Sequence, residues 1–117
     1  MILMIKKYTE KRPWGSFERF CENEACTIKI VTVNAGEELS LQYHRHRDEF
    51  WKIIKGNPKI VMGDKKTDGK EGDEFFVPKG TKHRITAGKE AAKVLEISFG
   101  KFDENDIVRL EDRYKRK

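Results

Sequence analysis

The chain has 117 residues, of which 38% are charged and 37% hydrophobic, and its formal net charge is +5 at pH 7. This length predicts a single domain, residues 1–117, and no apolar run approaches the roughly eighteen residues that a membrane-spanning helix needs. Residues 1–5 are too short for a secretory signal, so we expect a cytoplasmic protein that binds no membrane.

The N-terminal fifth of the chain is rich in aromatic residues. Residues 1–8 predict an edge strand, whereas Pro13 and Gly15 argue against a regular element in residues 11–20. We expect the aromatic side chains of the latter segment to cover one side of the core, with ligand stacking as the alternative. They are Trp14, Phe17 and Phe20.

Two cysteines, Cys21 and Cys26, follow this segment. Their spacing differs from the C-x-x-C pairs that bind zinc. In a cytoplasmic protein we expect reduced thiols, with a local disulfide as the alternative.

Short segments rich in apolar residues dominate the middle of the chain. Residues 26–33 are dense in β-branched side chains and end at a turn with Asn34 and Gly36, as a strand would. Similar segments recur about every ten residues, a rhythm typical of an all-β sandwich or barrel. They are residues 39–46, 49–56, 58–64, 74–78, 82–86 and 93–100. We expect residues 64–72 to form a polar turn.

The C-terminal segment, residues 102–117, is less clear. Asp103 or Asn105 would cap a short helix with apolar residues at spacings of three and four, but residues 107–110 suit a strand nearly as well. The basic residues at 113–117 predict a solvated tail rather than a nucleic-acid site. Positive charge around a concave pocket would instead suit an anionic metabolite such as a phosphorylated sugar.

Metal-ligand side chains concentrate between Gly36 and Gly56, which holds two of the three histidines. If this segment is extended, alternate side chains project from one face, and a glutamate follows after a short break. The third histidine comes after a turn at residues 78–80. This arrangement predicts a metal pocket built from two hairpins. Its candidate residues are Gln42, His44, His46, Glu49 and His83.

Two motifs in these segments resemble those of cupins, the double-stranded β-helix or jelly-roll barrels. The first cupin motif places an H-x-H pair and a glutamate between two glycines, and residues 36–56 fit it when Gln42 replaces the first histidine. The second places P-x-G before a histidine, and residues 72–83 fit it, with Ala87 where asparagine is usual. The resemblance implies an all-β cupin barrel. If residues 103–114 form a short helix, it would be added at the C-terminal end of this barrel.

The cupin register also implies a metal-ligand set: Gln42, His44, Glu49 and His83. Two imidazoles, a carboxylate and a neutral oxygen suit a divalent ion, with Zn²⁺ the first choice, and leave room for substrate oxygens. In this register His46 supports the ligands or faces the substrate.

A closer resemblance is to the type II phosphomannose isomerase domain, which in that family follows a mannose-1-phosphate guanylyltransferase domain. Four stretches carry it: residues 12–20, 39–51, 77–84 and 103–117. It implies a metal-dependent mannose-6-phosphate isomerase that interconverts mannose 6-phosphate and fructose 6-phosphate. The sequence has no glycine-rich nucleotidyltransferase signature, so we do not expect guanylyl transfer.

Aldose–ketose isomerisation would place specific demands on this pocket. A metal ion would stabilise the enediolate, and a base would move a proton between C2 and C1. His46 and Glu96 are both candidates for the base, and Arg84 is a further catalytic candidate. Cations that could bind the phosphate are Arg84, Arg109, Lys52 and Arg47, although strict alternation from His83 aims Arg84 away from the metal.

Strand alternation also predicts what faces the core. Trp51 and Ile53 share the parity of Glu49 and should line the interior, whereas Phe50 and Ile54 should face outwards. Because both faces are apolar, we expect a cover formed by the N-terminal segment or by a second subunit, and hence a homodimer.

The sequence is also compatible with two other functions. One is a different metal cupin enzyme, either an isomerase of another sugar phosphate or an oxygenase, although Gln42 argues against an iron oxygenase because histidine there is more usual. The other is a non-catalytic sugar-binding module.

Overall fold

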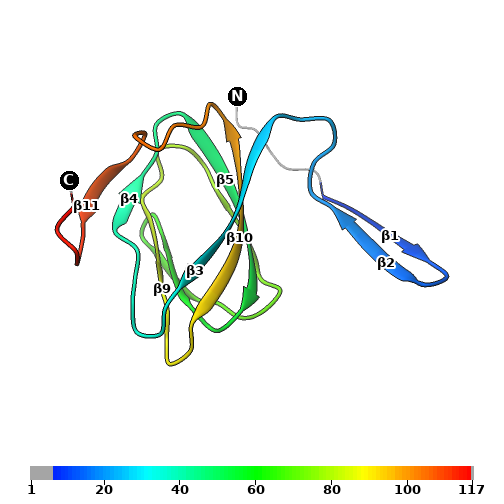
Figure 1. The fold of residues 1–117 in the computed structure, drawn as a ribbon, viewed down its shortest axis with the longest axis horizontal. Helices are drawn as coiled ribbons and strands as arrows, with labels where there is room; N and C mark the ends of the chain where they lie inside the picture. Colours follow the sequence, from blue (N-terminus) through cyan, green and yellow to red (C-terminus); the bar gives the residue numbers. More distant parts are fainter. Residues whose placement is uncertain (1–6, 117) are drawn as a thin grey trace.

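Two antiparallel β-sheets pack face to face around an apolar interior, which confirms the predicted all-β cupin barrel (Figure 1). The computed structural model describes residues 7–116, and the backbone in that range forms strands and no helix. The strands are β1 (Tyr8–Arg12), β2 (Gly15–Arg19), β3 (Cys26–Val33), β4 (Leu41–Tyr43), β5 (Arg47–Lys55), β6 (Lys59–Met62), β7 (Lys65–Asp68), β8 (Glu74–Val77), β9 (His83–Thr86), β10 (Ala92–Gly100) and β11 (Val108–Glu111).

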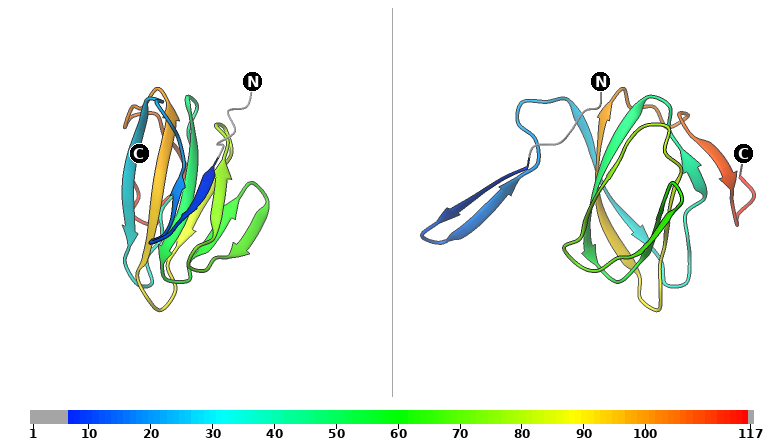
Figure 2. Two further views of the ribbon diagram at one scale, coloured as in Figure 1. Left: turned by 90° about the vertical axis from the view of Figure 1, so that its right-hand side faces the viewer. Right: turned by 180° about the vertical axis from the view of Figure 1, so that it is seen from behind.

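The strand order explains how distant segments meet. One sheet has the order β3-β10-β5-β8, the other has the order β11-β4-β9-β6-β7, and β1 pairs with β2 in a separate hairpin. The turned view shows the two layers of the barrel (Figure 2). The two predicted motif segments therefore contribute to both sheets, β5 to the first and β4 and β9 to the second.

The interior is filled by the side chains that strand alternation predicts. Trp51 and Ile53 are each 1% exposed, and they pack with residues of β6, β8, β9 and β10. Burying each side chain of this size contributes about 2–3 kcal/mol. Phe50 faces the other way into a second cluster with Ile97 and Phe99, and Ile54 is 45% exposed, so the predicted parity is confirmed.

The N-terminal hairpin corrects the prediction that residues 11–20 lack a regular element. Arg12 pairs with Gly15 across a two-residue turn at Pro13 and Trp14, so the turn residues separate two strands instead of preventing them. The hairpin extends from the barrel (Figures 1 and 2). The edge strand predicted for residues 1–8 lies mostly outside the described residues.

Only one of the three predicted covering residues covers the barrel. Phe20 packs on Phe50 with ring centroids 5.3 Å apart. Phe17 contacts Tyr8 within the hairpin, and Trp14 at its tip is 73% exposed. The prediction is therefore wrong for Trp14 and Phe17, because the hairpin carries them away from the sheet. Cys21 and Cys26 are free thiols with Sγ atoms 3.9 Å apart, as predicted.

Two polar or ambiguous segments are strands. The predicted turn at residues 64–72 contains β7, an edge strand whose side chains are mostly exposed, and this explains its polar sequence. The prediction of a C-terminal helix is wrong. Val108 and Arg109 pair with Tyr43 and Gln42, so β11 completes the backbone hydrogen bonds of β4.

Among the described residues, no helix is long and apolar enough to cross a membrane.

Candidate metal centre

Three side chains with metal-binding atoms meet between the two sheets at one end of the barrel. Glu49 lies on β5, His83 begins β9, and His44 directly follows β4. They are 1%, 1% and 3% exposed, respectively. One ligand atom from each lies within 4.8 Å of the other two. The sequence motifs therefore bring together three of the four predicted ligands in a buried cluster.

The nitrogen and oxygen atoms of this cluster lie close enough together to bind one cation. His44 Nε2 lies 3.4 Å from Glu49 Oε2, and His83 Nε2 lies 3.9 Å from Glu49 Oε1. The two imidazole rings are 5.0 Å apart between centroids. These atoms are of the types that bind Zn²⁺ and similar divalent ions.

Backbone carbonyls fix both imidazoles in the tautomer that binds metal through Nε2. His44 Nδ1 lies 2.6 Å from the carbonyl oxygen of Asp106, and His83 Nδ1 lies 2.9 Å from that of Thr81. Because a carbonyl only accepts, each Nδ1 carries the hydrogen and each Nε2 carries a lone pair. His83 Nε2 is buried and has no hydrogen-bond partner within residues 7–116. A metal ion would satisfy it.

The protonation states also suit a cation. Burial lowers the pKa of His44 and that of His83 below the ordinary histidine value, so both imidazoles are neutral near pH 7. Burial by itself raises the pKa of Glu49, but the hydrogen bonds from Glu96 and from the charged Arg47 lower it, and the net shift is downward. Neutral imidazoles and an ionised carboxylate are the forms that bind metal.

Glu96, a candidate base, lies beside the cluster on β10. Burial first, and then the charge of Glu49, raises the pKa of Glu96 to about 8. Its carboxyl is hydrogen-bonded to Glu49, which also accepts a 3.0 Å hydrogen bond from Trp51 Nε1. A protonated Glu96 is an acid at neutral pH, so the structure assigns it the ability to donate a proton rather than to remove one.

Gln42, the fourth predicted ligand, lies on β4 directly opposite His83 on β9. Residues paired in this way project from the same face of the sheet, so the amide faces the side that carries the cluster. Its Oε1 accepts a 2.6 Å hydrogen bond from Ser40 Oγ, which orients the amide. Arg109 pairs with Gln42 from β11 and shares this face.

Arg47 lies at the cluster itself. Its Nε donates to Glu49 Oε2 at 3.0 Å, and its Nη2 lies 3.2 Å from His44 Nε2. The guanidinium also donates to the carbonyl of Asp103 and lies over the ring of Phe102, with 4.7 Å to the ring centroid. Of the predicted phosphate-binding cations, Arg47 and Arg109 are the two that face the cluster.

The other predicted site residues lie elsewhere. His46 is exposed and lines a separate 290 Å³ pocket with Asp106, because the chain bends between β4 and β5. Lys52 is on the outer face, where it pairs with Glu18 and Glu74. The structure does not bring these two residues to the cluster.

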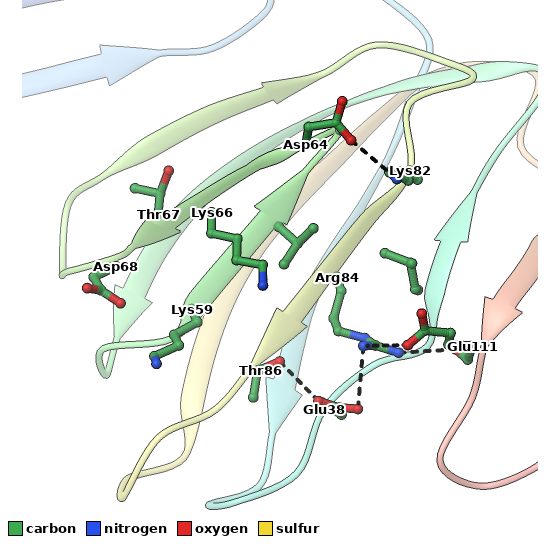
Figure 3. Close-up of a pocket in the computed structure, with 13 residues that line it drawn as sticks. Glu38, Lys59, Asp64, Lys66, Thr67, Asp68, Lys82, Arg84, Thr86 and Glu111 are labelled. Atoms are coloured by element: carbon green, nitrogen blue, oxygen red, sulfur yellow. Dashed lines mark hydrogen bonds and ion pairs between the residues drawn. The ribbon is translucent and has the colours of Figure 1, made fainter.

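Arg84 faces outwards, as strict alternation from His83 predicts. It lies in a 590 Å³ groove on the five-stranded sheet (Figure 3). There it donates to the carbonyl of Leu39 and forms ion pairs with Glu38 and Glu111. Its assignment as a catalytic residue is therefore not supported by its position.

Sequence reasoning missed the groups that orient the ligands. Asp106 accepts hydrogen bonds from the backbone N–H groups of Arg45 and His46, at 2.9 and 3.0 Å, and its own carbonyl binds His44. Thr81 binds His83 through its carbonyl. Backbone carbonyls leave no signal in side-chain identity, whereas the acidic Asp106 could have been noticed as a candidate anchor.

The structure has the features of a cupin with a candidate His/Glu metal site. The chain belongs to the family described as "Mannose-6-phosphate isomerase C-terminal", whose family model matches residues 4–112.

Solved structures support the fold. The chain is similar to a conserved protein with a double-stranded β-helix domain from Klebsiella pneumoniae, with a TM-score of 0.65, 20% identity, and coverage of 79% of this chain and 80% of that one. It is also similar to oxalate decarboxylase from Bacillus subtilis, with a TM-score of 0.67, 27% identity, and coverage of 74% of this chain and 24% of that one.

Curated relatives share more sequence. The chain is 36% identical to the xanthan biosynthesis protein XanB of Xanthomonas campestris, covering 90% of this chain and 23% of XanB. It is also 36% identical to the mannose-1-phosphate guanylyltransferase ManC of Salmonella typhimurium, covering 90% of this chain and 22% of ManC. The chain thus spans less than a quarter of the length of the curated relatives it matches.

These names correct the predicted function. ManC is named for guanylyl transfer, a different reaction from the isomerisation of mannose 6-phosphate. The predicted isomerase function and enzyme class are therefore wrong as assignments for this chain, even though the family description contains the isomerase name. What the comparisons show is a cupin domain of a family connected with mannose metabolism.

Proposed function

We propose that the chain is a divalent-metal-binding cupin domain that recognises a phosphorylated mannose. One observation carries the proposal. The Nε2 atoms of His44 and His83, each with its tautomer fixed by a backbone carbonyl, lie beside the ionised Glu49 carboxylate in the interior of the barrel. Two imidazoles and one carboxylate are a common protein ligand set for Zn²⁺, which leaves a position for an exogenous oxygen. Zn²⁺ is therefore the ion we propose.

The residues divide into ion-binding and ligand-binding groups. His44, Glu49 and His83 would hold the ion, and Gln42 would add a neutral oxygen from the same face. The bound ion would polarise an oxygen of the ligand. Glu96, protonated at neutral pH, would keep its hydrogen bond to Glu49 and so hold the carboxylate of this ligand in place.

Mannose 1-phosphate is the ligand that the relatives suggest, because ManC is named for this sugar phosphate. The phosphate needs a cation, and Arg109 shares the inward face with Gln42. Arg113 is an exposed arginine elsewhere in the C-terminal segment. Its side chain donates a hydrogen bond to the carbonyl of Gly36. It therefore provides a matched control for Arg109.

Calorimetric titration with mannose 1-phosphate tests this proposal. Zn²⁺-loaded protein should bind the sugar phosphate, chelator-treated protein should bind it at least about tenfold more weakly, and Arg109→Gln should weaken binding more than Arg113→Gln does. Equal binding with and without Zn²⁺ would contradict the proposal.

We also propose a second copy of this chain as the partner. No residue of β1 or β2 is buried, and an isolated two-stranded hairpin is at best marginally stable. The outer face of β3 carries two further exposed apolar side chains, Ile28 and Ile30. A two-fold symmetric dimer would cover the hairpin and the β3 face of both copies with one repeated contact.

A further inference from the structure

The positively charged side chain of Arg47 occupies part of the candidate metal site. The Arg47 guanidinium contacts two of the three proposed ligands, Glu49 Oε2 at 3.0 Å and His44 Nε2 at 3.2 Å. The Arg47 side chain is 7% exposed, so these contacts lie inside the barrel. Arg47 has this position because it shares the strand parity of Glu49 on β5.

These contacts use the lone pairs that a metal ion would need. A guanidinium has only N–H donors and stays charged, so His44 Nε2 must be the acceptor in its contact with Arg47. The Nδ1 hydrogen bond to Asp106 requires the same tautomer. His83 Nε2 is the one ligand nitrogen of the cluster that Arg47 leaves unpartnered within the described residues.

We propose that Arg47 is an internal competitor that lowers the metal affinity of the site and must withdraw when the ion binds. This inference rests on the proposed metal-binding function. A guanidinium and a divalent cation about 4 Å apart repel strongly in a poorly solvated site. Phe102 and the carbonyl of Asp103 also contact the guanidinium, so these two contacts would hold it once it leaves His44.

The competitor also has a role without metal. A buried glutamate with no nearby cation would be unfavourable, and Arg47 supplies the compensating charge. Removing the charge should therefore lower the stability of the metal-free protein while raising its metal affinity. If Arg47 only held the ligands in position, its replacement would instead weaken metal binding, because the ligands would lose their positions.

Titration with Co²⁺, followed by calorimetry and by the visible absorption of the bound ion, tests the proposal. Arg47→Gln and Arg47→Met should bind Co²⁺ about tenfold or more tightly than wild type, and Arg47→Lys should stay near wild type. Arg45→Gln is the matched control, because Arg45 is exposed two residues away. Its affinity should equal that of wild type. Circular dichroism identifies any variant that does not fold, and the two charge-removing variants provide independent tests.

The outcomes separate this inference from the proposed function. If wild type binds Co²⁺ and the folded Arg47→Gln and Arg47→Met proteins bind it no more tightly, the competitor role is wrong and the metal site stands. If neither wild type nor these variants bind Co²⁺, the metal site itself is wrong. Tighter binding in both variants, with unchanged binding in Arg45→Gln, supports the competitor.

Discussion

Glu96 and Glu49 share a hydrogen bond between β10 and β5, so that a protonated carboxyl lies beside an ionised one. Such a pair carries one negative charge instead of two in a poorly solvated interior. The single charge is balanced by Arg47 in the structure. The proton that the pair retains makes the stability of the protein depend on pH.

The stability of the protein should fall as pH rises through the neutral range because of Glu96. Its folded-state pKa of about 8 lies above the unfolded value, so the folded state keeps a proton that the unfolded state has lost. Stability from this group is complete at acid pH and declines until the pH exceeds about 8. Urea unfolding of wild type and Glu96→Gln should show the variant gaining relative stability from about pH 5 to pH 8, by at most about 1.4 kcal/mol per pH unit. If the difference in unfolding free energy between wild type and Glu96→Gln did not change with pH, Glu96 would not be protonated in the folded state.

The interior packing predicts losses of stability of very different size for two adjacent isoleucines. Ile53→Ala removes a side chain that is 1% exposed and should destabilise the fold by about 2–5 kcal/mol. Ile54→Ala, on the outer face of the same strand, should cost less than about 1 kcal/mol. Chemical denaturation measures both values, and similar losses would contradict the assigned strand parity.

The proposed dimer predicts a specific effect at the hairpin tip. Trp14→Ser should shift the protein towards the monomer in light scattering coupled to size-exclusion chromatography, because the exposed indole would lose its contact with the second copy. Tyr114→Ser, at another exposed aromatic residue near the C-terminus, should leave the mass unchanged. A monomeric wild-type protein at high concentration would rule out this role for Trp14.

The sequence predicted the site better than its surroundings. Motif spacing located His44, Glu49 and His83, because cupin spacing reflects where β4, β5 and β9 lie in the barrel. It also selected Gln42 with His44 in place of the pair His44 and His46, and the structure places His46 in a separate pocket. Alternation placed Trp51 inside and aimed Arg84 outwards, since side-chain direction follows directly from strand geometry.

The failures involve partners that are distant in sequence. β11 is a strand because the edge of β4 needs hydrogen bonds, although the local spacing of apolar residues also suits a helix. β7 is polar because its side chains face solvent at a sheet edge. The contact of Arg47 with His44 could not be predicted, because a long arginine side chain can reach many partners and strand alternation fixes only the face from which it starts.

Gln42 tests the register of the first motif. If its amide oxygen binds the ion, Gln42→Ala should lower Zn²⁺ affinity by about tenfold or more, because one of four ligands is lost. Ser40→Ala, which removes the hydrogen bond to the Gln42 amide, should have a smaller effect of the same sign. Zn²⁺ affinity measured with a competing chelator provides the comparison. An unchanged affinity in Gln42→Ala would limit the protein ligands to three.

The most direct test of the metal centre compares the buried His83 with the exposed His46. Zn²⁺ titration by calorimetry should show one ion per chain for wild type and for His46→Ala, because His46 is exposed and lies outside the cluster. His83→Ala should lose at least about a hundredfold in affinity, because it removes the buried Nε2 that the fold leaves unpartnered within residues 7–116. Zn²⁺ binding of wild-type strength by a folded His83→Ala protein would contradict the account.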